Sequence, residues 1–243
     1  MKTNAHMRRG FTLVELLVVI VIIAALAGLT APMVIRQRKK ADQTEAVSNA
    51  RQVGLAMMEF ESEYGSFPDG KLGEEINSRT GGTLAPTQIT KSNDAFRQLI
   101  AAEIATSEVM FYCKTGFSTK KPDNVSNTAQ TALSKGEVGF AYIMNNTDAF
   151  TAAGNPGRVL IAAPLDYSSG TISSDKFDRD AYDAKAVVLK MDNSVTSLSV
   201  NKDGRAILST GSAGSSTKFL LDGKSEDTVW GASGSPTMVI PDK

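Results

Sequence analysis

One uninterrupted apolar stretch limits what this chain can fold into. Residues 11–35 read FTLVELLVVIVIIAALAGLTAPMVI, and Glu15 is the only charged side chain among them. As a helix, these 25 residues would span roughly 37 Å at about 1.5 Å each, enough to cross a hydrocarbon core of about 30 Å. A buried helix of a soluble protein is rarely this long and this apolar, so the sequence predicts a membrane-inserting segment.

Basic residues flank this stretch on both sides. Lys2, Arg8 and Arg9 precede it, and four more Lys and Arg residues lie within 36–40. The positive-inside rule compares Lys and Arg near the two ends of a span. With the amino terminus counted, the two sides are equal, so charge alone leaves the orientation open.

Two simpler interpretations of the stretch compete. A cleaved signal peptide would also have a basic start, an apolar run and a small-residue site, here Ala25-Leu26-Ala27, but the run continues to Ile35. A plain membrane anchor would have no need of Glu15, because an ionised group at the bilayer centre costs about 2.5–3.5 kcal/mol on insertion scales. We therefore expect this carboxylate to have a functional partner.

The segment Arg9-Gly10-Phe11-Thr12-Leu13-Val14-Glu15-Leu16 resembles the processing site of type IV pilins and type II secretion pseudopilins. The shared features are a basic residue, Gly, Phe, a Glu as the fifth residue after the cut, and the long apolar run. The resemblance implies that a prepilin peptidase cuts between Gly10 and Phe11 on the cytoplasmic side and N-methylates Phe11. The resemblance also implies that the N-terminus is cytoplasmic. It extends to Pro32, which lies where many pilins carry a proline that loosens the helix.

The residue types suit this chemistry. Gly10 has no side chain, so a protease can approach the backbone closely. Cleavage would create a cationic amine on Phe11, with which Glu15 could pair on its own chain or on a neighbouring subunit. Such a pair is stronger in a low-dielectric environment than at a surface, and it would favour one axial register during assembly. Pro32 lacks a backbone donor and would weaken the helix near its membrane exit.

Beyond the apolar stretch, the pattern predicts a helix that enters a soluble domain. Apolar residues recur at steps of three and four from Ala46 to Tyr64, which indicates that residues 36–64 form an amphipathic helix packed on a sheet. Gly65 is expected to end it. Residues 61–68, ESEYGSFP, resemble the segment that ends this helix in major pseudopilins.

The remaining residues predict a linking region and a sheet. Residues 65–136 are polar, with a loop at 66–92 and a short helix at 93–105 capped by Ser92 or Asn93. Residues 137–243 are expected to form an antiparallel β domain. Its expected strands lie at 138–144, 159–163, 186–191, 195–200, 206–208 and 219–221, with a hairpin turn at Asp192-Asn193-Ser194. The predicted fold is therefore α+β and pilin-like, with residues 1–10 as a leader and 11–35 as the transmembrane and filament-core helix.

Four carboxylates fall within nine residues, at Asp175, Asp178, Asp180 and Asp183. Calcium takes six to eight oxygen ligands, often from Asp residues in a loop. Some major pseudopilins bind calcium in a loop of the C-terminal sheet, so the resemblance makes this cluster a candidate calcium site. The spacing is not that of an EF-hand, and a solvated acidic turn is the alternative. We expect no other cofactor.

Composition excludes several other kinds of site. Cys113 is the only Cys, which excludes an internal disulfide and a multi-Cys metal site, and its expected role is a small buried residue. The only His, His6, lies in the predicted leader, so the processed chain would have none for a catalytic relay. The whole chain has 26 basic and 26 acidic residues, but residues 41–243 carry 19 basic against 25 acidic ones. We therefore expect no nucleic-acid partner.

Together these features predict a pseudopilin-like structural subunit of a type II secretion system, and not an enzyme. It would cross the bacterial inner membrane once, with the C-terminal domain in the periplasm, and assemble into a periplasmic filament. The expected partners are the prepilin peptidase, other pilin or pseudopilin subunits, the inner-membrane assembly platform and membrane lipid. Two alternatives stay open: a type IV pilin for adhesion, motility or DNA uptake, and a secreted or membrane-anchored hydrolase that uses a carboxylate pair.

Overall fold

A computed structural model describes residues 12–129, 131–146, 148–167, 176–209, 218–222, 229–230 and 235–243. The chain divides into two units, and the boundary in the sequence lies between Lys39 and Lys40. Its described helices are α1 (Leu13–Tyr64), α2 (Gly73–Thr80), α3 (Ser92–Ala101) and the short 3-10 helix η1 (Glu108–Phe111). Its described strands are β1 (Ala141–Asn145), β2 (Val159–Ala163), β3 (Lys185–Lys190), β4 (Val195–Val200), β5 (Ala206–Ser209), β6 (Lys218–Phe219) and β7 (Pro236–Val239).

Helix α1 contains residues 13–35 of the apolar stretch and the predicted amphipathic segment. Within the second unit it buries one face, formed by Ala46, Asn49, Ala50, Val53, Gly54, Ala56, Met57 and Phe60. Each of these residues lies three or four positions from another of them, so they form one stripe along the helix. Gly65 ends the helix as predicted, and its φ of 82° is one that L side chains rarely adopt.

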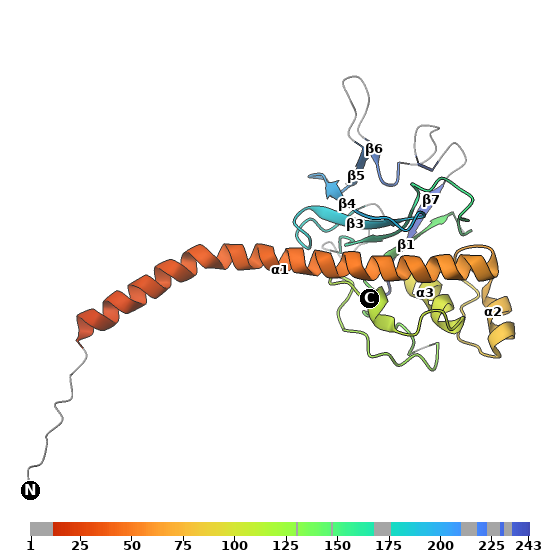
Figure 1. The fold of residues 1–243 in the computed structure, drawn as a ribbon, viewed down its shortest axis with the longest axis horizontal. Helices are drawn as coiled ribbons and strands as arrows, with labels where there is room; N and C mark the ends of the chain where they lie inside the picture. Colours follow the sequence, from red (N-terminus) through yellow and green to blue (C-terminus); the bar gives the residue numbers. More distant parts are fainter. Residues whose placement is uncertain are drawn as a thin grey trace, which may run out of the picture. The chain divides into compact units, whose positions relative to one another are not determined.

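The strands form one antiparallel sheet in the order β6-β5-β4-β3-β2-β1-β7. Strands β3 and β4 make the predicted hairpin, in which Asn193 has a φ of 60° and the Asp192 carboxylate accepts a hydrogen bond from the Ser194 amide at 2.9 Å. In the view of Figure 1 the part of α1 in the second unit has the sheet on one side and α2 and α3 on the other, and α3 also contacts β1. Its buried stripe joins the strands in one hydrophobic core. The predicted α+β, pilin-like class is confirmed.

The loop predicted at 66–92 is wrong in part, because α2 forms there. Its stability comes from tertiary contacts that local propensity does not report. Ile76 is fully buried, and the Asn77 side-chain amide exchanges two 2.9 Å hydrogen bonds with the backbone of Ala85. Gly81, with a φ of 67°, ends the helix.

The cap predicted for α3 is also wrong. Asp94 accepts hydrogen bonds from the amides of Thr90 and Lys91, at 3.0 and 2.9 Å, just before the helix begins, and the Ser92 amide donates to the Ile240 carbonyl. Ser92 instead donates to the Phe140 carbonyl at 2.7 Å, and Asn93 donates to the Leu133 carbonyl at 2.8 Å. These two side chains therefore connect α3 to the rest of the domain.

The observed sheet differs from the sequence prediction in two ways. Strand β1 begins at Ala141 and not at residue 138, because the Gly139 amide donates to the Phe111 carbonyl and not to a neighbouring strand. Strand β7 is absent from the sequence prediction. It pairs with β1 antiparallel, with Tyr142 opposite Val239, so the end of the chain returns to the edge of the sheet next to β1.

Candidate functional site

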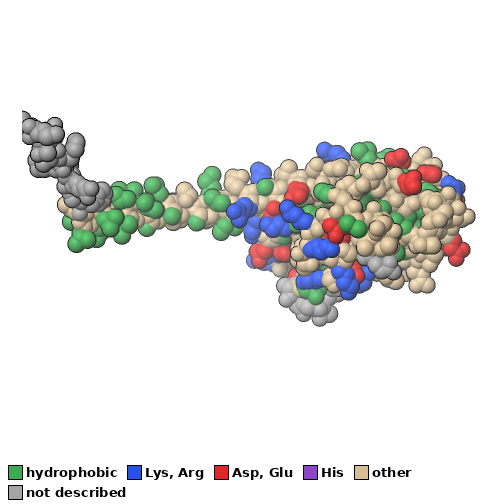
Figure 2. Space-filling model, turned by 90° about the horizontal axis from the view of Figure 1, so that it is seen from below, with side chains coloured by type: hydrophobic (Ala, Val, Ile, Leu, Met, Phe, Trp, Pro, Cys, Tyr) green, Lys and Arg blue, Asp and Glu red, His purple; other side chains and the backbone are tan. Residues whose placement is uncertain are grey.

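The first candidate site is the apolar part of α1. By length and composition, α1 contains a segment that could cross a membrane, and none of that segment is buried within the structure. Its large apolar side chains are 46–86% exposed from Leu13 to Ile35. Figure 2 shows hydrophobic side chains along this segment. So much exposed apolar surface requires an apolar partner, either lipid or other helices.

Glu15 forms a capping box with Thr12 at the start of α1. Its Oε2 accepts from the Thr12 amide at 2.9 Å and from the Thr12 hydroxyl at 2.7 Å, while the Glu15 amide donates back to the hydroxyl at 3.3 Å. A T-x-x-E spacing before an apolar run is the sequence signature of this motif. That signal is present in the sequence, although the resemblance to a processing site points only to the Phe11 amine as a partner of Glu15.

Both hydrogen bonds that the Glu15 carboxylate accepts from Thr12 end on Oε2, and no described residue bonds to Oε1. The capping box thus leaves one carboxylate oxygen for a further donor. Gly10 and Phe11, the predicted cleavage and methylation residues, lie outside the described residues. Their roles, and the assembly role of Glu15, stay predictions.

Pro32 lies inside α1, and the helix continues through it. Because Pro has no amide donor, the Gly28 carbonyl lacks its usual partner four residues later. Nearby, the Thr30 hydroxyl donates to the Leu26 carbonyl at 3.1 Å. The predicted weakening of the helix at Pro32 stays a prediction.

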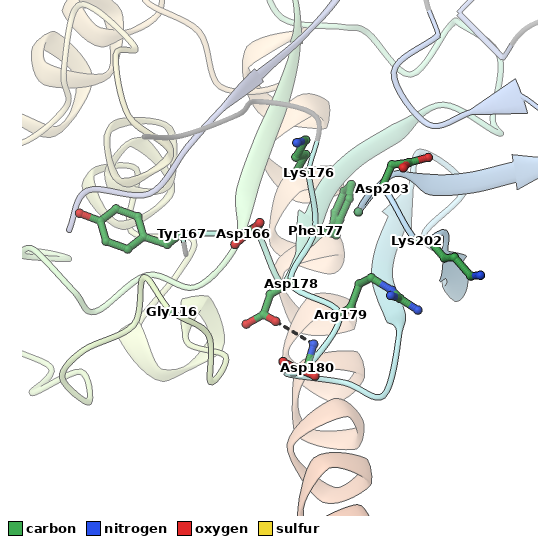
Figure 3. A pocket seen from close by; sticks show the side chains of 11 residues that line it. Gly116, Asp166, Tyr167, Lys176, Phe177, Asp178, Arg179, Asp180, Lys202 and Asp203 are labelled. Atoms are coloured by element: carbon green, nitrogen blue, oxygen red, sulfur yellow. Dashed lines mark hydrogen bonds between the residues drawn. The ribbon is translucent and has the colours of Figure 1, made fainter. Parts of the chain in front are cut away.

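The acidic cluster predicted to bind calcium lies beside an open pocket of about 740 Å³. Asp175 lies outside the described residues. Figure 3 shows Asp178 directing its carboxylate to the backbone of Asp180, whose amide donates to it at 2.8 Å. Asp180 and Asp183 are exposed. Asp178, Asp180 and Asp183 do not bring three ligand atoms within 4.8 Å of one another. Calcium binding here stays a prediction.

A different trio of carboxylates does converge. Ligand oxygens of Glu108, Asp123 and Glu137 all lie within 4.8 Å of one another, with Glu108 and Glu137 buried. Burial, together with the neighbouring Glu137 carboxylate, raises the pKa of Glu108 above its ordinary value. The sequence does not reveal this trio, because Glu108 and Glu137 are far apart in the chain and no short motif joins them.

Cys113 is fully buried, as its sequence context predicted. Burial raises the pKa of its thiol, so the nucleophilic thiolate is disfavoured. Tyr182 is also buried, and burial raises the pKa of its hydroxyl, which has no hydrogen-bond partner among the described residues. This arrangement is that of a core residue.

Comparison with known proteins matches the N-terminal part of the chain. Residues 5–31 match the family model described as the prokaryotic N-terminal methylation motif. Over 70 residues the chain is 34% identical to type II secretion system core protein G of Pectobacterium carotovorum subsp. carotovorum, a match that covers 29% of this chain and 45% of that protein. Over 68 residues it is 38% identical to the protein of the same name from Escherichia coli (strain K12), covering 28% and 47%.

The chain thus matches about half the length of these curated relatives, and no solved structure matches it significantly. The prepilin motif and the partial similarity to core protein G pseudopilins are confirmed.

Proposed function

We propose that this chain is a pseudopilin-like structural subunit of a type II secretion system. The observation that carries the proposal is the methylation motif at residues 5–31, of which residues 13–31 lie in an exposed apolar helix. The names of the two relatives, both core proteins of type II secretion systems, favour a secretion role over a surface pilus. In this role the chain is a substrate of a peptidase and not itself an enzyme.

The proposed sequence of events begins at the inner membrane. The apolar part of α1 inserts with the basic residues Arg8 and Arg9 on the cytoplasmic side. A prepilin peptidase then hydrolyses the Gly10–Phe11 peptide bond, which leaves a carboxylate on Gly10 and a cationic amine on Phe11. Methylation of that amine keeps its positive charge. The domain from Lys40 onwards lies in the periplasm.

Assembly then brings apolar helices of several subunits together. Glu15 would use Oε2 to cap its own helix and Oε1 to accept from a Phe11 amine, so the capping box and the pairing between subunits are compatible. A charged pair in that low-dielectric environment is satisfied only in the correct axial register. The partners implied are other pseudopilin subunits, the inner-membrane assembly platform and lipid.

The test is mass spectrometry of the mature N-terminus after expression with and without a prepilin peptidase. We expect a start at Phe11 carrying one methyl group when the peptidase is present, and uncleaved protein when it is absent. Gly10→Lys should block cleavage with the peptidase present, whereas Ala27→Leu keeps the span apolar and would affect only a cut after residue 27. A start at Gly28, or an N-terminus that does not depend on the peptidase, would overturn the proposal.

A further inference from the structure

The linking region between α3 and β1 holds a second, unpredicted acidic cluster. Glu108 begins η1, Asp123 lies in an exposed loop, and Glu137 precedes β1. Glu108 and Glu137 are 1% and 0% exposed. Carboxylates are almost never this buried unless they are paired or bind a metal, so the cluster requires a positive charge or a proton.

Each buried carboxylate is held by one of its oxygens. Glu108 Oε1 accepts from the Leu133 amide at 2.9 Å. Glu137 Oε2 accepts from the Ser134 amide and hydroxyl at 2.6 and 2.8 Å. These bonds fix both side chains from the protein side and leave the second oxygen of each within the cluster.

The second oxygens of Glu108 and Glu137, Oε2 and Oε1, are the observation that points to a ligand. Glu108 Oε2 is buried and has no hydrogen-bond partner among the described residues. Glu137 Oε1 is in contact with the Lys120 ammonium at 2.8 Å, and Asp123 Oδ2 lies 3.8 Å from the same nitrogen. One ammonium therefore contacts two of the three carboxylates, and Glu108 Oε2 is left without a partner among the described residues. The Lys120 side chain is 48% exposed, so it can move into solvent.

We propose that Glu108, Asp123 and Glu137 form a site for a hard divalent cation, which displaces the Lys120 ammonium on binding. Oxygen ligands of calcium lie at about 2.3–2.6 Å from the ion, so two of them can be at most roughly 5 Å apart. The 4.8 Å limit within the trio meets that condition without a change of backbone. An all-oxygen ligand set of carboxylates is the kind that suits calcium, magnesium and manganese.

Calcium suits this site better than magnesium. The three carboxylates come from separate segments of the chain, and Asp123 lies in an exposed loop. Calcium accepts flexible and irregular coordination, whereas magnesium demands near-ideal octahedral geometry. Water on the exposed side of Asp123 would complete the coordination. The ion would join three separate segments between α3 and β1. Leu133, next to the site, is already held to α3 by Asn93 and Arg97.

The competing explanation is that Lys120 is a permanent counter-ion. Both explanations place a positive charge beside Glu137, but they differ in what removal of Lys120 does. If Lys120 is only a structural partner, Lys120→Ala destabilises the domain and a cation does not restore it. If Lys120 occupies a cation site, the same substitution removes a competitor, so calcium binds more tightly and restores stability.

The experiment is titration of the full chain, in detergent and free of metal, with calcium chloride and in parallel with magnesium chloride. Isothermal calorimetry gives the affinity, and unfolding followed by fluorescence of the only Trp, Trp230, gives Tm. We expect one calcium site, weaker magnesium binding, and a Tm rise of about 5–10 °C at 100 times Kd.

The variants locate the site. Asp123→Asn keeps the Oδ1 atom that accepts from the Val125 amide, so it should fold normally and bind calcium at least about tenfold more weakly. Lys120→Ala should bind about tenfold more tightly, because it removes a charge next to the ion. Asp180→Asn with Asp183→Asn is the control and should match the parent chain. No calcium heat, or affinity lost only in that control, would overturn the proposal.

Discussion

Two adjacent methionines in α1 give a direct test of which face the domain uses. Met57 is fully buried and Met58 is 43% exposed, although both are the same residue type in the same turn of one helix. Replacing a buried Met with Ala removes its contacts and leaves a cavity, at a cost of about 2–5 kcal/mol. For a domain of this size about 1 kcal/mol shifts Tm by roughly 2–4 °C, so Met57→Ala should lower Tm by about 4–20 °C.

Met58→Ala is the matched control. Its loss of partly exposed surface is offset by the slightly better helix propensity of Ala, so we expect a change under about 1 kcal/mol. Trp230 reports the transition, because it is buried, stacks on Phe150 and donates to the Leu220 carbonyl at 2.7 Å. Equal Tm shifts in the two variants, or a larger one for Met58→Ala, would refute the assigned orientation of α1.

Three further predictions concern assembly, packing and reactivity. Glu15→Gln keeps an oxygen for the Thr12 amide but loses the charge, so it should abolish filament assembly, whereas Thr12→Ala keeps the charge and should assemble. Co-purification of tagged with untagged subunits measures assembly. An equal loss of assembly in both variants would mean that Glu15 acts only by capping the helix. Gly139→Ala should lower the free energy of unfolding by about 1–3 kcal/mol, because a Cβ would lie 2.8 Å from the Cys113 backbone nitrogen. Gly82→Ala is the control, because its Cβ would have no contact under 3.4 Å, and it should leave the free energy of unfolding in urea unchanged. Cys113, whose pKa is raised by burial, should react with a thiol reagent only after unfolding, and rapid labelling of the native chain would contradict its placement in the core.

The parts of the fold that sequence predicted are those with a local, repeated signal. The helix from Leu13 to Tyr64 has a continuous pattern and a Gly at its end, and the hairpin around Asn193 has both strands and the turn within sixteen residues. Strand β7 has no such signal. Pro236–Val239 is short and only partly buried, and it forms a strand because β1 offers an unpaired edge almost a hundred residues earlier.

The same distinction separates the two acidic clusters. Asp178, Asp180 and Asp183 stand out because they are close in sequence, yet Asp180 and Asp183 are exposed and the three do not converge. Glu108 and Glu137 are isolated in sequence, and the fold brings them together through backbone bonds to Leu133 and Ser134. A high local density of Asp residues in the sequence therefore identified exposed charge. The buried carboxylates, which need a positive charge or a proton, come together only through the tertiary structure.

The two parts of α1 show why folding and assembly can be separated by mutation. From residue 40 onwards, the helix buries a single stripe, because only one side of it meets a core. From Leu13 to Ile35 apolar residues occupy every side, so that segment requires an apolar environment around its whole circumference. Lipid can supply this for a single subunit, and neighbouring helices can supply it in a filament. A variant at Met57 should therefore change Tm, whereas exposed Leu55 and Met58, three residues apart on one face, should affect contacts between subunits while the domain keeps its stability.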